Sequence, residues 1–191
     1  MVIPGFIATD RTTMELRRSL AAAGFRVHPW RQGWNLGARA DTLDRLREAL
    51  NALPGEQRVL LVGWSLGGLF ARELARIEPE RVRAVVTLGS PLSGDPRQVT
   101  NVWKLYERIA GHPVDRPPIR HSQDKPPVPT LAIWSRRDGI VAPAAARGAA
   151  HCSDRAVEVG SSHMGMAVSR RATRQIAEEI RQFLDAAESP D

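Results

Sequence analysis

A serine, an aspartate and a histidine, which together can perform nucleophilic catalysis, occur in that order along this chain. Ser65 is the middle residue of GWSLG (63–67), which fits the pattern G-x-S-x-G. In that pattern the serine lies on a sharp turn from a strand into a helix, and the flanking glycines remove side chains that would collide there. We predict that Ser65 is a nucleophile. The alternative is a turn of small residues that packs the helix close to the sheet.

The base and the acid that such a serine needs follow later in the sequence. His163 lies in VEVGSSHMGMAVS, just past the last expected strand, whereas the other histidines fall inside a strand or in irregular loops. An imidazole needs a carboxylate to fix its tautomer and to stabilise its charged form. Asp138 follows TLAIWSRR directly, although an Asp-Gly pair is also a common turn signal. Asp95 is the alternative acid. We predict a triad of Ser65, Asp138 and His163.

Two backbone N–H groups complete the expected chemistry by binding the negative charge that develops on a carbonyl oxygen. The N–H of Leu66 follows the nucleophile and begins a helix, whose positive end faces the site. The N–H of Phe6 lies in PGFIATD, where Gly5 allows a close approach of the backbone, although Pro4-Gly5 alone is compatible with an ordinary turn. We predict an oxyanion hole made by Phe6 and Leu66.

These residues must be positioned by a sheet, because each one follows an apolar segment of strand length. Segments that are apolar end to end alternate with amphipathic helical patterns, which indicates a parallel sheet covered on both faces. Ligands of such sheets bind beyond the carboxyl ends of the strands. The fold class is therefore α/β, a doubly wound and mostly parallel sheet of about six strands. After the short segment MVIPGF, the expected strands are 25–30, 58–64, 83–90, 130–135 and 156–160, and the expected helices are 11–24, 40–53, 66–77, 101–111 and a C-terminal helix.

The length of 191 residues favours one domain spanning 1–191. The irregular segment 92–128 interrupts the alternation, and we expect either a cap or lid over the site or a small helix packed on the domain edge. Three tryptophans near the expected site, Trp34, Trp64 and Trp103, are predicted to contact substrate, and residues 34–36 are expected to form another wall of the cleft.

Composition narrows the choice of partner and compartment. The net charge is +6, but arginines and acids are interspersed, so we expect no nucleic-acid partner. The single cysteine excludes an intrachain disulfide and a cysteine-rich zinc site. We expect no metal and no cofactor. No apolar stretch reaches the roughly 20 residues that span a bilayer, and no signal peptide is visible, so we expect a cytoplasmic protein; a start codon further upstream would reopen that question. Peripheral contact with a membrane and the oligomeric state are left open by the sequence.

With these residues in place, the sequence resembles the α/β-hydrolases over nearly its whole length, and in particular small bacterial lipases and esterases. The resemblance is carried by PGF, VGWSLGG, VVTLGSP, IWSRRDGIVAP and GSSHMG. It departs from the family in its very short first strand and in Trp64, where many relatives have histidine. The resemblance implies hydrolysis of a small-molecule or lipid ester through an acyl-serine intermediate. Acyl transfer, thioester hydrolysis and an inactive hydrolase-fold binding protein are the alternatives.

Overall fold

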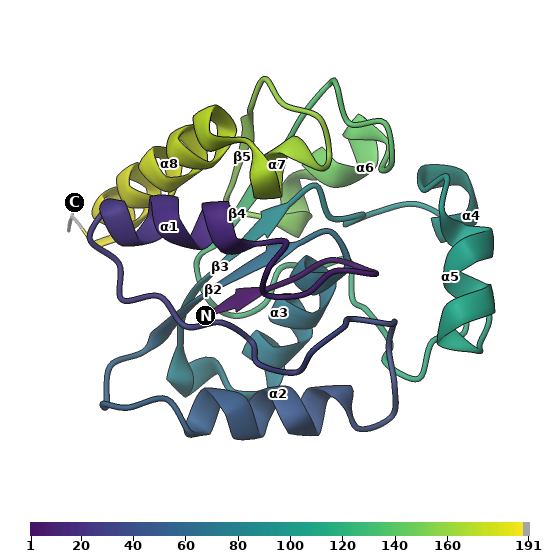
Figure 1. Cartoon of the computed structure of the whole chain (residues 1–191), viewed down its shortest axis with the longest axis horizontal. Helices are drawn as coiled ribbons and strands as arrows, with labels where there is room; N and C mark the ends of the chain where they lie inside the picture. Colours follow the sequence, from purple (N-terminus) through teal and green to yellow (C-terminus); the bar gives the residue numbers. More distant parts are fainter. Residues whose placement is uncertain (189–191) are drawn as a thin grey trace.

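The computed structural model describes residues 1–188, so the last three residues of the expected 1–191 domain lie outside the described part. A five-stranded parallel sheet forms its centre (Figure 1), and its strands lie in the order in which they occur along the chain. The α/β prediction with a parallel sheet is therefore confirmed. The strands are β1 (Val2–Ile3), β2 (Val59–Trp64), β3 (Val82–Leu88), β4 (Thr130–Trp134) and β5 (Arg155–Glu158).

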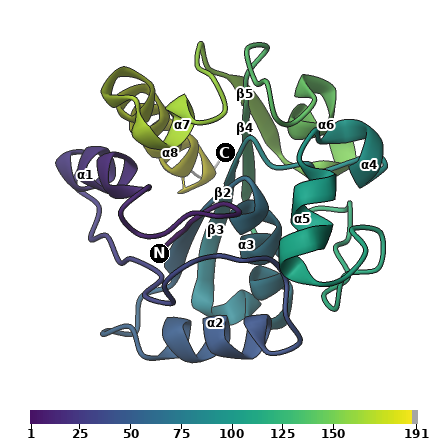
Figure 2. The same ribbon diagram turned by 45° about the vertical axis from the view of Figure 1, so that its right-hand side comes forward.

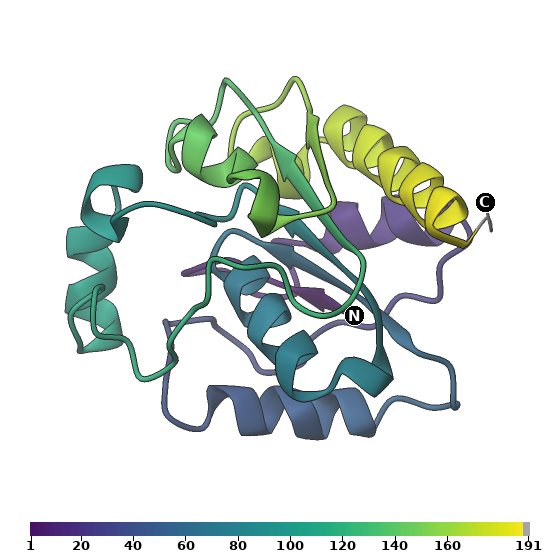
Figure 3. The same cartoon turned by 180° about the vertical axis from the view of Figure 1, so that it is seen from behind.

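Helices cover both faces of the sheet. α1, α7 and α8 pack together on one face, and α2 and α3 lie on the other, as Figures 1 and 3 show from opposite sides. Within residues 1–188, every helix is either too short or too polar to cross a lipid bilayer. The helices are α1 (Met14–Ala22), α2 (Thr42–Asn51), α3 (Leu66–Ile77), α4 (Pro96–Val99), α5 (Trp103–Ala110), α6 (Pro143–Arg147), α7 (Gly165–Val168) and α8 (Arg170–Glu188), with short 3₁₀ turns at Pro79–Arg81 and Ala150–Cys152.

The core explains why the strands are apolar throughout. Successive residues of a strand point to opposite faces, so a strand buried on both faces needs apolar residues at every position. In β2, Val62 belongs to the cluster that contains Ile176 of α8, whereas its neighbour Leu61 belongs to the cluster that contains Phe70 of α3. Each fully buried side chain of this size contributes roughly 1.5–3 kcal/mol to folding.

The strand expected at 25–30 is not formed, and the sheet accordingly has five strands where about six were predicted. This segment meets β1 only through an isolated bridge between Val2 and Pro29 and a hydrogen bond from the Val2 N–H to the His28 carbonyl (2.9 Å). The next N–H along the segment that could face β1, that of Trp30, donates to the Asp10 carboxylate (3.1 Å), and Arg31 turns the chain with a φ of 59°. The bridge lies on the side of β1 opposite β2, so the order of elements reverses at β1, where this architecture places its ligand site.

Segment 92–128 stands beside the carboxyl ends of the strands and carries α4 and α5 (Figure 2). Its far end is fastened to α3. Arg72 is buried, and its guanidinium donates to the carbonyl oxygens of Cys152 (2.6 Å), Gln123 (2.8 Å) and Asp124 (2.7 Å). Burial lowers the pKa of Arg72. The segment thus has one end fixed to the helix that begins at the predicted nucleophile, and its movement as a lid stays a prediction.

Candidate active site

Ser65 is the single residue between the end of β2 and the start of α3. Its backbone has φ 54° and ψ −122°, a conformation that costs a residue with a side chain about 1–3 kcal/mol. Two hydrogen bonds hold it there: the Ser65 N–H donates to the Leu88 carbonyl (2.8 Å), and the Ser90 hydroxyl donates to the Ser65 carbonyl (2.7 Å). The neighbouring strand therefore fixes the turn from both sides.

The glycines around Ser65 leave room for neighbouring backbone. A Cβ atom on Gly63 would collide with the Gly67 carbonyl, and one on Gly67 would collide with the Ile3 carbonyl of β1. A Cβ on Gly68 would meet the Ser90 hydroxyl that holds the turn. These close contacts explain why glycine is needed on both sides of Ser65, and they require a third glycine at position 68.

Asp138 and His163 lie together at the neighbouring strand ends. His163 Nδ1 and Asp138 Oδ2 are 2.7 Å apart, and both side chains are almost fully shielded from water. The second carboxylate oxygen of Asp138 accepts the N–H groups of Ile140 (2.9 Å) and Val141 (2.8 Å). The carboxylate is therefore held in one orientation by backbone donors while its other oxygen faces the imidazole.

The alternative acid, Asp95, caps a helix and does not contact His163 in the structure. Its side chain accepts the Arg97 N–H (3.0 Å) and caps the start of α4. Gly89, one residue past β3, makes room for the pair that does form. A Cβ there would lie 2.9 Å from Asp138 Oδ2 and 3.1 Å from His163 Nδ1. The geometry thus pairs His163 with Asp138 and leaves Asp95 at a helix terminus.

Trp64 packs against His163 and is absent from the lining of the pocket that Ser65 borders. Its side chain is buried, its ring lies 5.5 Å from the His163 ring between centroids, and its indole N–H donates to the His163 carbonyl (3.1 Å). This ring contact brings His163 beside the residue that precedes Ser65. The hydrogen bonds of the described residues include none between Ser65 and His163. Such contacts are commonly long without substrate and tighten when it binds.

The loop after β1 lies against the serine. A Cβ atom on Gly5 would be 3.1 Å from Ser65 Cβ, so the backbone of residues 5 and 6 runs directly beside the predicted nucleophile. Within the described residues, the N–H groups of Phe6 and Leu66 donate to no protein acceptor. Both predicted oxyanion donors are therefore available to a ligand.

Asn35 fastens this loop, and the sequence pointed to it only as a wall of the cleft. Its side-chain amide donates to the Pro4 carbonyl (2.8 Å), its backbone carbonyl accepts the Ile7 N–H (2.8 Å), and its own N–H donates to the Ala8 carbonyl (2.9 Å). Ile7 has a φ of 52°, which is strained for a β-branched residue. These three bonds span Phe6 from both sides and hold it in place.

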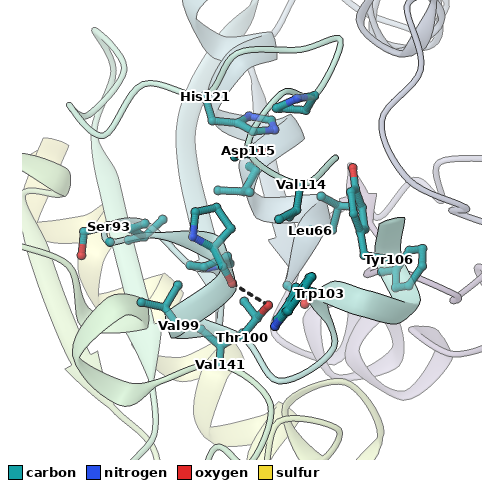
Figure 4. Close-up of a pocket in the computed structure, with 18 of the residues that line it drawn as sticks. Leu66, Ser93, Val99, Thr100, Trp103, Tyr106, Val114, Asp115, His121 and Val141 are labelled. Carbon is teal, nitrogen blue, oxygen red and sulfur yellow. Dashed lines mark hydrogen bonds between the residues drawn. The ribbon is translucent and has the colours of Figure 1, made fainter. Parts of the chain in front are cut away.

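Ser65, Phe6 and Leu66 line a pocket of about 690 Å³ (Figure 4). Most of its remaining wall comes from segment 92–128, including Trp103. Trp34 is 61% exposed and lines a separate, smaller hollow. Of the three tryptophans predicted to contact substrate, the structure therefore places only Trp103 in the pocket.

Burial shifts the pKa of two titratable side chains of this wall, His121 and Tyr106. Burial, aided by the charge of Arg72, lowers the pKa of His121 to about 4. Burial also raises the pKa of Tyr106, whose ring packs on that of Phe6 with 5.1 Å between centroids. In the part of the chain that the structure describes, no three histidine, cysteine or acidic side chains gather as a metal site would require.

Comparison with known proteins agrees with this architecture. Residues 28–113 match the family model for the alpha/beta hydrolase fold. A search of curated protein sequences found no significant match.

Solved structures resemble almost the whole chain. A pyrethroid hydrolase from Sphingobium faniae superposes with a TM-score of 0.67 and 20% identity, covering 98% of this chain and 98% of that one. Polyneuridine aldehyde esterase gives 0.66 at 15% identity, covering 94% and 97%. The thioesterase domain from the curacin biosynthetic pathway gives 0.66 at 16%, covering 95% and 89%. Together with the sheet and the strand-to-helix turn at Ser65, these likenesses identify the chain as a protein of the α/β-hydrolase fold.

Proposed function

We propose that this protein is a serine hydrolase that cleaves carboxylic esters through an acyl-serine intermediate. One observation carries the proposal above the others. Ser65 is held in a strained turn and lines the pocket of about 690 Å³, and a buried Asp138–His163 pair follows β4 and β5 at the same edge of the sheet. A serine in an ordinary turn of small residues would have no need of such a pair.

In the first half of the reaction, Ser65 Oγ forms a bond to the ester carbonyl carbon. Asp138 accepts the hydrogen of His163 Nδ1, so Nε2 is left free to take the Ser65 proton. The negative charge on the carbonyl oxygen is held by the N–H groups of Phe6 and Leu66. The C–O bond to the alcohol then breaks, and His163 gives its proton to the departing alkoxide.

In the second half, water replaces the alcohol. His163 takes a proton from water, the resulting oxygen attacks the acyl carbon, and the bond to Ser65 Oγ breaks as His163 returns the proton to it. The products are one acid and one alcohol. The same residues would cleave a thioester, since only the leaving group differs.

Labelling with a fluorophosphonate tests the proposal. Such a probe phosphonylates an activated serine hydroxyl, so we expect one adduct on Ser65 in the folded protein and none after denaturation, as read by mass spectrometry of the peptides. Hydrolysis of 4-nitrophenyl esters and of matched acyl thioesters then ranks the two substrate classes. If the folded protein is not labelled and hydrolyses neither class of substrate, the proposal that it is a serine hydrolase is wrong.

The hydrogen bonds of Asn35 allow a test of the loop after β1, which carries the Phe6 N–H. Asn35→Asp replaces the amide that donates to the Pro4 carbonyl with a carboxylate oxygen that repels it, while keeping the acceptor for the Gly37 N–H. Loss of an oxyanion donor costs about 10²–10³ in kcat, and a displaced donor should cost about tenfold or more. We expect kcat to fall while KM changes less than roughly threefold, because most of the pocket wall comes from segment 92–128, which the substitution leaves in place.

Asn51→Ala is the matched control, because Asn51 is exposed at the end of α2, away from this loop. Steady-state kinetics on one 4-nitrophenyl ester measures all three proteins, and thermal unfolding checks that each is folded. An Asn35→Asp protein with wild-type kcat would show that Asn35 does not position the loop for catalysis.

A further inference from the structure

The pocket has two ends of different chemistry. Val141, at one end, donates its N–H to Asp138, so this end adjoins the Asp138–His163 pair. In Figure 4 it is grouped with Val99 and Thr100, while Asp115 and His121 lie at the opposite end. We call this opposite end, formed by residues 114–123, the distal wall.

The distal wall carries positive charge that the protein does not neutralise. Arg116 and Arg120 both line the pocket. Within residues 1–188, neither guanidinium has a hydrogen bond or an ion pair with another protein group. The carboxylate in the same wall, Asp115, is already paired with Arg97 (3.2 Å), which also pairs with Glu107 (3.2 Å).

The distal wall is also held in position before any ligand binds. Glu107 accepts the Val114 N–H (3.0 Å), Glu73 of α3 accepts the Ser122 N–H (3.0 Å), and Arg72 holds the Gln123 carbonyl. Both ends of the wall are thus tied down on either side of the two arginines. A ligand group that binds here would pay little to order the backbone that presents them.

His121 adds a polar but uncharged group to the same wall. It lines the pocket, its pKa is lowered to about 4 by burial, and its Nδ1 is buried without a partner in the described structure. At neutral pH the positive charge of this wall therefore comes from the two arginines. Guanidinium groups bind carboxylates and phosphates through paired hydrogen bonds.

We propose that the substrate carries an anionic group, a carboxylate or a phosphate, which Arg116 and Arg120 bind at the distal wall while its acyl carbon lies at Ser65. This inference rests on the proposed ester or thioester hydrolysis and names the substrate class of that site. The anion has two sources: a carboxylate at the far end of the acyl chain, or a phosphate on the leaving group.

Paired substrates test the inference and separate the two sources. The first pair is 4-nitrophenyl hemiglutarate against 4-nitrophenyl valerate, which differ in a terminal carboxylate. The second is the valeryl thioester of 4′-phosphopantetheine against the valeryl thioester of pantetheine, which differ in one phosphate. We expect the anionic member of one pair to have a kcat/KM about tenfold or more higher, since a charge-assisted bond amounts to about one such factor, and we expect added salt to reduce the advantage.

Arginine variants locate the effect. Arg116→Gln and Arg120→Gln should each lower kcat/KM for the favoured anionic substrate by about tenfold and leave its neutral partner within about twofold. The control is Arg108→Gln, because Arg108 is exposed on α5 and does not line the pocket. Equal rates within both pairs, or equal losses on charged and neutral substrates, would overturn the inference.

Failure of the proposed function is distinguishable from failure of this inference. Turnover of neutral esters with no preference for anions refutes only the inference, whereas absence of both turnover and fluorophosphonate labelling refutes hydrolysis. In the second case, calorimetric titration of the wild-type protein and the arginine variants with glutarate and with coenzyme A decides the anion site. Binding that the variants lose supports it, and no binding overturns it.

Discussion

Ser65→Ala is expected to lower kcat/KM for an ester substrate by on the order of 10⁴-fold or more, which leaves only the activity of the remaining site. The physical reason is that the substitution removes the single atom that forms the acyl bond and nothing else. Alanine tolerates the strained backbone as poorly as serine does, so the fold should be retained. Steady-state kinetics with a 4-nitrophenyl ester measures the loss, and circular dichroism confirms folding.

Ser93→Ala is the matched control, since Ser93 also lines the pocket but lies away from the strand-to-helix turn. It should keep its activity within about threefold, because substitutions that leave the reacting groups in place change the barrier little. If Ser65→Ala kept the wild-type rate, the nucleophile would have to be another residue and the proposed mechanism would be wrong.

Asp138→Asn should lower kcat by on the order of 10⁴-fold although it changes one atom. The asparagine oxygen can still accept the N–H groups of Ile140 and Val141, which leaves its amide nitrogen facing His163 Nδ1. An amide donates toward that nitrogen, so the ring hydrogen moves to Nε2, where it blocks acceptance of the Ser65 proton. Rapid kinetics should show that formation of the acyl-enzyme is slowed.

Asp95→Asn supplies the control for this prediction and tests the alternative acid at the same time. Asparagine caps a helix about as well as aspartate, so neither α4 nor the activity should change appreciably. A large loss of kcat in Asp95→Asn, with Asp138→Asn nearly unaffected, would reverse the assignment of the acid.

Much of the architecture is predictable from sequence because its signals are local. The pattern of residues 66–77 predicts a helix that coincides with α3, and the apolar run before it coincides with β2. Ser65 stands out because glycines flank it at the junction of an apolar run and a helical pattern. Asp138 and His163 follow because parallel strands end at one edge of a sheet, so residues after different strands meet there.

The features that escaped prediction depend on partners distant in the sequence. Trp64 follows an apolar run and could have faced either side, and only the position of His163 explains its burial. Asn35 holds backbone groups some thirty residues away, so no local pattern reveals it. The segment 25–30 is apolar enough for a strand, yet the Trp30 N–H donates to the side chain of Asp10, twenty residues earlier.

Some of the short helices did have a local signal. α4 begins at Pro96 after the cap Asp95, and α6 begins at Pro143. Proline at the first position of a helix is a recognised start signal, because its missing N–H would be unpaired there in any case. Their short length, rather than their chemistry, hides them in a search for periodic patterns.

In the proposed binding mode, the fastening of the distal wall to α3 lets that helix set the distance between Ser65 and the anionic group of the substrate. Ser65 stands at its start, and Arg72, which holds the wall, lies seven residues along, so helical rise alone sets about 10 Å between them along the axis. A helix keeps its length far better than a loop does. Selection of substrate length should therefore be insensitive to changes elsewhere in the fold, and proteins of this type should acquire new length preferences by altering residues 114–123 and leaving the helix unchanged.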